Sequence, residues 1–173
     1  IKVDKSTHQL AGSKSEVVTE GLDGLRGRLA EYYDMGARFT KWRAVFSISE
    51  TTPSDYAISV NAHALGRYAA LAQEAGLVPI VEPEILMDGS HSIDSCFAAS
   101  ERTLRTVFEE LSAQGVALEG MILKPNMVIS SHESPKRATS AEVAERSLTC
   151  FKRTVPAAVP GIAFLSGGQG DEE

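Results

Sequence analysis

Five short segments rich in β-branched and apolar residues recur along the chain at nearly even spacing. Their starts lie 38, 39, 42 and 41 residues apart, and the segments are residues 1–4, 39–48, 78–86, 120–128 and 161–165. A repeat near forty residues with one strand in each unit is typical of propeller blades or of repeated βα units. The residues between the strands decide which of the two applies.

Apolar residues between the strands have helical spacing. After Thr52-Pro53, which we expect to cap and begin a helix, Ile58, Ala62, Leu65, Ala69 and Ala72 follow at spacings of three and four until Gly76. Comparable patterns predict helices near residues 22–36 and 97–115, and a capping box at residues 139–142 begins another. Because strands and helices alternate without hairpin signals, we predict an α/β fold with a parallel sheet, as one domain over residues 1–173.

Three of the predicted strands carry charged or polar residues, although a strand covered on both faces is usually apolar. These residues lie two positions apart and therefore share a face: Lys41 and Arg43, Glu82 and Glu84, Lys124 and Asn126. Any one of them is explained by a buried ion pair or by a side chain that reaches solvent. Their recurrence over consecutive strands favours a functional site, because burying several charges is costly. In a (β/α)₈ barrel such a site lies inside, at the carboxyl ends of the strands.

A lysine near a second cation and a carboxylate is suited to nucleophilic catalysis by an amine. Desolvation and a neighbouring positive charge favour the neutral amine, which attacks a carbonyl to form a Schiff base, and a carboxylate moves the protons. Lys124, Lys41 and Glu82 provide these groups. Residues 164–169 add a strand that ends in paired glycines, which is either an anion-binding loop or a simple turn.

Composition excludes several classes of protein. The chain has 173 residues, 17 Lys and Arg against 23 Asp and Glu, and a formal charge of −6, which argues against a nucleic-acid or anionic membrane partner. We find neither an apolar run of about 18 residues, the length of a membrane span, nor the layout of a signal peptide. The four histidines lie far apart, so we expect no metal, and no nucleotide-binding motif indicates another cofactor. Cys96 and Cys150 are expected to be buried thiols of a cytoplasmic protein.

Four strings in this sequence closely resemble class I fructose-1,6-bisphosphate aldolase. They are KWR from Lys41, VPIVEPEILMDG from Val78, LEGMILKPNMV from Leu118 and RTVPAAVPGIAFLSGGQ from Arg153. The resemblance covers essentially the whole chain. It implies a (β/α)₈ TIM barrel, cleavage of a sugar phosphate through a lysine Schiff base without a metal, a homotetramer and a cytoplasmic location. FLSGGQ and VEPEIL speak against a transaldolase-like enzyme, which would share the nucleophile.

The resemblance also implies roles for individual residues. Lys124 would form the Schiff base, Glu82 would be the general acid and base, and Glu84 would neighbour it in the site. Lys41 and Arg43 would contact hydroxyl or phosphate groups of the substrate. The remaining phosphate contacts would come from Lys2, Ser166, Gly167 and Gly168.

The five units present would correspond to strands three to seven of the eight-stranded barrel. We therefore expect a full-length enzyme to have further residues at both ends, which would supply strands one, two and eight. The alternative is a truncated, non-catalytic aldolase that binds sugar phosphates or associates through its open sheet edges. A cleavage assay together with the intact mass distinguishes the two.

Overall fold

The computed structural model describes residues 1–164 and residue 169. Its elements are, in chain order, β1 (Thr7–Gln9), β2 (Val17–Thr19), α1 (Leu25–Asp34), β3 (Phe39–Phe46), α2 (Asp55–Glu74), β4 (Val78–Ile85), α3 (Ile93–Ala113), the 3₁₀ helix η1 (Leu118–Gly120), β5 (Ile122–Leu123) and α4 (Ser140–Thr154).

The central sheet is parallel, as the alternation of strands and helices predicts. β3, β4 and β5 lie side by side in chain order, with Phe39 opposite Val78 and Val81 opposite Leu123. Single parallel bridges extend the sheet at both edges, from Lys2 to Lys41 and from Leu123 to Ile162. All five predicted segments therefore follow one another across one sheet, although the outer two contribute one bridge each.

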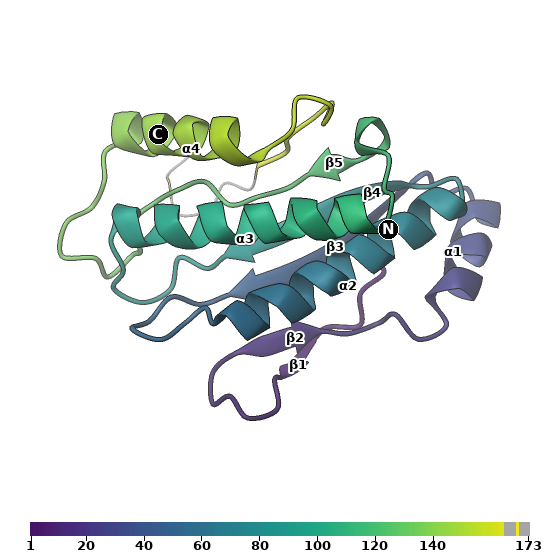
Figure 1. The fold of residues 1–173 in the computed structure, drawn as a ribbon, viewed down its shortest axis with the longest axis horizontal. Coiled ribbons are helices and arrows are strands. Elements are labelled where there is room, and N and C mark those ends of the chain that lie inside the picture. The colour runs from purple at the N-terminus through teal and green to yellow at the C-terminus, as the bar shows by residue number, and fades with distance from the viewer. Residues whose placement is uncertain (165–168, 170–173) are drawn as a thin grey trace.

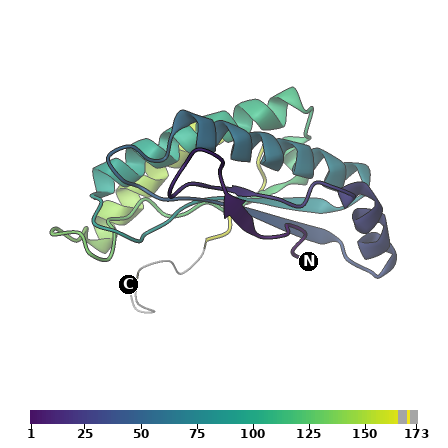
Figure 2. The same ribbon diagram turned by 90° about the horizontal axis from the view of Figure 1, so that it is seen from below.

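Among the described residues, helices cover only one face of this sheet. Figures 1 and 2 show α2 and α3 lying along the same side of the strands, with α4 beside α3. On the covered face, Trp42 of β3 stacks on Tyr68 of α2 with 5.5 Å between the ring centroids. The Thr40 hydroxyl and the Tyr68 hydroxyl are hydrogen-bonded at 2.8 Å. The apolar core therefore lies between the sheet and the helices. Side chains on the opposite face of each strand do not take part in this core.

Two of the predicted helix starts can be checked at their caps. The capping box of α4 is confirmed, because the side chains of Thr139 and Glu142 each accept a hydrogen bond from the other's backbone N–H. The predicted start of α2 at Thr52-Pro53 is wrong. Ser54 is the N-cap instead, and its hydroxyl accepts a hydrogen bond from Ala57 N at 3.1 Å.

The expectation of strands and helices without a hairpin is also wrong near the N-terminus. β1 and β2 form a short antiparallel hairpin before α1. It is held by a buried network in which Thr19 N donates to Asn61 Oδ1 at 3.0 Å and the Thr19 hydroxyl donates to Arg43 O at 2.8 Å. Strands of three residues are too short to show a clear two-residue alternation, so the sequence carries little signal for them.

The two cysteines are buried free thiols, as predicted, in α3 and α4. Burial raises the pKa of Cys96 and raises the pKa of Cys150 to about 12. Because the thiolate is the reactive form, iodoacetamide at pH 8 is expected to leave both unmodified in the native protein and to modify both in urea. Intact mass after each reaction is the measurement. Equal rates of modification in the two states would contradict this burial.

Candidate active site

The face of the sheet without helices carries the charged residues of the predicted strands. Trp42, Val81 and Leu123 are neighbours in register and lie on the covered face, so the residues next to them along each strand point the other way. This places five predicted site residues on the open face: Lys41, Arg43, Glu82, Glu84 and Lys124. Apolar residues of these strands therefore lie in the core, and the charged residues next to them lie on the open face with the candidate site.

Glu82 lies at the centre of this face and joins two lysines. The Lys124 ammonium donates a hydrogen bond to Oε1 of Glu82 at 2.7 Å. Lys41 Nζ lies 2.7 Å from the other oxygen, Oε2, as an ion pair outside hydrogen-bond geometry. The Glu82 side chain is only 2% exposed. A buried carboxylate in contact with an amine can exchange a proton with it directly, which is the contact that a nucleophilic lysine and a general acid or base need.

Glu84 pairs with Arg43. Nε of Arg43 donates to Glu84 Oε2 at 2.5 Å. This hydrogen bond is the main cause that raises the pKa of the Arg43 guanidinium, with desolvation acting against it. Glu84 thus fixes the orientation of the Arg43 guanidinium, which has further N–H donors beside the one that bonds to Glu84.

Asp4 belongs to the same cluster, although the sequence analysis did not select it. Its carboxylate forms an ion pair with Lys2 at 2.9 Å and accepts hydrogen bonds from Arg43 N at 3.3 Å and Ser6 N at 3.2 Å. The signal was present, because Lys2 and Asp4 lie two residues apart like the pairs on the longer strands. Asp4 therefore joins the first segment of the chain to β3 and holds Lys2 beside the site.

Asn126 does not share the open face with Lys124, so that expectation is wrong. β5 ends at Leu123, and Asn126 accepts a hydrogen bond from Ile85 N and donates one to Ser100 on α3. Pro125 has no N–H and cannot continue the ladder, so a two-residue alternation no longer describes the chain beyond it.

The cluster exposes its cations and buries its carboxylates. Side-chain exposure is 20% to 56% for the cations and 2% to 7% for the carboxylates. The cations are Lys2, Lys41, Arg43 and Lys124, and the carboxylates are Asp4, Glu82 and Glu84. Among the described residues, the cluster thus has one more positive than negative charge, and its accessible groups are positive. Such a surface attracts an anionic substrate. Ser166, Gly167 and Gly168 lie outside the described residues.

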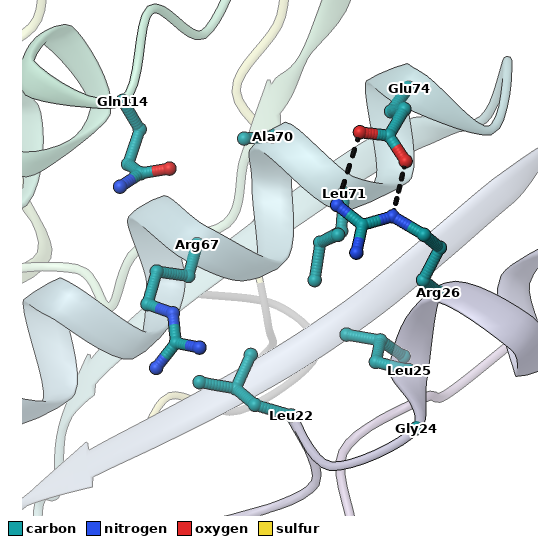
Figure 3. A pocket seen from close by; sticks show the side chains of 9 residues that line it. All are labelled: Leu22, Gly24, Leu25, Arg26, Arg67, Ala70, Leu71, Glu74 and Gln114. Carbon is teal, nitrogen blue, oxygen red and sulfur yellow. Dashed lines mark hydrogen bonds and ion pairs between the residues drawn. The ribbon is translucent and has the colours of Figure 1, made fainter.

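A second feature of the molecule is a cavity of about 520 Å³ between α1, α2 and the end of α3 (Figure 3). Arg26 and Glu74 form an ion pair at 2.6 Å on one side of it, and Arg67 and Gln114 lie on the other. None of the described candidate site residues lines this cavity. We therefore place the candidate chemistry on the open sheet face.

Comparison with known proteins identifies the family to which this chain belongs. The sequence profile of class I fructose-bisphosphate aldolase, a glycolytic family, matches residues 1–173. The chain belongs to the class I fructose-bisphosphate aldolase family. It is 60% identical over 173 residues to a probable fructose-bisphosphate aldolase class 1 of Xanthomonas axonopodis pv. citri, and 56% identical to the cytosolic fructose-bisphosphate aldolase 6 of Arabidopsis thaliana. These matches cover all of this chain but 52% and 48% of those two relatives, so it spans about half of their length.

A solved aldolase structure also superposes on this chain. The fructose-bisphosphate aldolase of Plasmodium falciparum, crystallised with TRAP and a small-molecule inhibitor, is 47% identical and gives a TM-score of 0.96. The superposition covers 99% of this chain and 50% of that one. The predicted fold class is confirmed: the parallel sheet and its helices form part of a (β/α)₈ barrel of the aldolase type. In the residues that the structure describes, no helix is long and apolar enough to cross a membrane.

Proposed function

We propose that this protein is a class I fructose-bisphosphate aldolase. It cleaves fructose 1,6-bisphosphate reversibly to dihydroxyacetone phosphate and glyceraldehyde 3-phosphate. The observation that carries the proposal is the 2.7 Å hydrogen bond between Lys124 and the buried Glu82, on a face whose exposed groups are cations. In this proposal the nucleophile, its proton-transfer partner and the cations that would attract a phosphate ester come from neighbouring strands.

The first half of the reaction forms the imine. The neutral amine of Lys124 attacks the C2 ketone of the substrate, and proton transfer gives a carbinolamine. Glu82 in its acid form protonates the carbinolamine hydroxyl, which leaves as water while the nitrogen lone pair forms the C=N bond. The lysine nitrogen remains bonded to C2 as a protonated imine.

The second half breaks the bond between C3 and C4. The electron pair of that bond moves toward the protonated imine and gives an enamine, while the C4 hydroxyl gives its proton to an ionised carboxylate of the site and becomes the aldehyde of glyceraldehyde 3-phosphate. Protonation of C3 and addition of water to the imine then release dihydroxyacetone phosphate and restore the Lys124 amine. The imine serves as the electron acceptor, which is why this chemistry has no step that requires a metal ion.

The other residues of the site bind and orient the substrate. Lys41 and Arg43 lie on the same face as Lys124 and would contact hydroxyl or phosphate oxygens. Lys2, bridged in register to Lys41, would add a phosphate contact. Ser166, Gly167 and Gly168 would bind the phosphate of the three-carbon product. Glu84 would keep Arg43 oriented through their 2.5 Å contact.

The remaining proposals concern the complete enzyme. Residues 1–173 would form strands three to seven of the barrel, in a cytoplasmic homotetramer. The support for a cytoplasmic location is that similar plant proteins are named as cytosolic or cytoplasmic isozymes.

A cleavage assay on the protein carrying this sequence tests the function. Fructose 1,6-bisphosphate is expected to give equal amounts of the two triose phosphates. Binding of the bisphosphate without cleavage would instead support a non-catalytic sugar-phosphate-binding protein.

A further inference from the structure

Asn126 lies where β5 can no longer pair with β4 through its main chain. Lys124 N donates to Val81 O at 2.8 Å, which is the last main-chain bond between the two segments in the described structure. Pro83 and Pro125 follow on the two sides, and neither has an N–H to donate. The gap in the ladder thus falls at the level of Glu82 and Lys124.

The Asn126 side chain closes this gap. Its Oδ1 accepts a hydrogen bond from Ile85 N at 2.9 Å, in the place that a strand carbonyl would occupy. One hydrogen bond between the two segments therefore lies on each side of the contact between Lys124 and Glu82. The first runs from Lys124 N to Val81 O, and the second runs from Ile85 N to Asn126 Oδ1. Without the second bond, the chain beyond Lys124 is tied to β4 on one side only.

The other end of the same amide is fixed to the helix layer. Nδ2 of Asn126 donates to the Ser100 hydroxyl and to Met127 O, both at 3.0 Å, and lies 3.8 Å from Cys96 Sγ. Ser100 is 2% exposed, so its hydroxyl is a fixed partner within the core. One side chain thus connects β4, the segment after β5 and α3.

We propose that Asn126 is a positioning residue that sets the distance between the Lys124 amine and the Glu82 carboxylate. It does not touch the substrate, and it acts by holding residues 124–126 in register with β4. The proposal rests on the proposed function, because that distance matters only if Glu82 exchanges protons with Lys124 and its adducts. Misplacing a reacting group by about 1 Å can cost about 100-fold in rate.

The experiment measures the rate at which the imine forms. The protein is mixed with saturating dihydroxyacetone phosphate, and sodium borohydride reduces the imine at successive times to a stable adduct counted by intact mass. Asn126→Ala is expected to form the adduct about 10- to 100-fold more slowly, with a lowered kcat for cleavage and a KM that changes little. Ser100→Ala, which removes only the distal partner of the amide, is expected to show a smaller decrease in the same direction.

Thr103→Val is the matched control. Thr103 is also a buried hydroxyl of α3, and its Oγ1 has no hydrogen-bond partner among the described residues. This variant is expected to form the adduct at the wild-type rate. All rates are compared at a temperature at which circular dichroism shows each variant folded, so that a loss of stability alone does not change them.

The outcomes separate this proposal from the proposed function. A wild-type protein that forms no adduct would overturn both. A wild-type adduct on Lys124 together with an Asn126→Ala rate equal to wild type would overturn only the positioning role. Should Asn126→Ala fail to fold, Ser100→Ala decides, because an unchanged rate in that variant overturns the proposal and a slowed rate supports it.

Discussion

Replacing Lys124 by alanine is expected to lower kcat for the cleavage of fructose 1,6-bisphosphate by roughly 10⁴-fold or more, the scale on which removal of a covalent nucleophile acts. In the proposed mechanism Lys124 contributes the amine that bonds to the substrate, while Lys41 forms an ion pair with the other oxygen of Glu82. The variant retains the ion pair between Glu82 and Lys41, so the fold is expected to persist. Steady-state cleavage and circular dichroism are the two measurements.

The control for this substitution is Lys152→Ala. Lys152 is an exposed lysine in the last turn of α4 and is not one of the candidate site residues. It is expected to retain wild-type kcat. A Lys124→Ala variant that cleaves the bisphosphate within a few-fold of wild type would show that the nucleophile lies elsewhere.

Replacing Glu82 by glutamine is expected to slow imine formation by about 10²- to 10⁴-fold, the usual contribution of a general acid or base. Glutamine has nearly the same shape but cannot deliver the proton that allows the carbinolamine hydroxyl to leave. The cations that face the substrate remain, so binding of the bisphosphate is expected to persist. Single-turnover kinetics separates the two steps, and calorimetric titration measures the binding.

Glu84→Gln provides the contrast to this variant. It removes the carboxylate that orients Arg43 and leaves the contacts of Glu82 with both lysines in place. We expect weaker substrate binding with a smaller change in the rate of imine formation. If Glu82→Gln and Glu84→Gln had the same effect on that rate, Glu82 would have no special role in proton transfer.

The longest strands account for the part of the site that the sequence predicts. β3 and β4 pair without a break over eight residues each, so successive side chains alternate between the two faces of the sheet. Lys41, Arg43, Glu82 and Glu84 are thereby assigned to the face opposite Trp42 and Val81. Parallel pairing in chain order then brings the charges together. Local periodicity is sufficient here because the core fixes one face of every strand.

Periodicity fails where a proline or a short element interrupts it. Pro125 ends β5 after two residues, which redirects Asn126 from the open face toward Ser100. The same limit explains the missed hairpin, whose strands have three residues each. For Asp4 the local spacing with Lys2 was present, but its link to the site is a hydrogen bond from Arg43, 39 residues away in the chain. A contact of that kind depends on tertiary structure, which a local pattern does not contain.

The central claim is that Lys124 is the residue that bonds to the substrate. Reduction with sodium borohydride in the presence of dihydroxyacetone phosphate, followed by proteolysis and mass spectrometry of the peptides, tests it directly. We predict one modified lysine, at position 124, in the peptide that contains LKPNM. An adduct on Lys41 or on any other lysine, or no adduct at all, would contradict the claim.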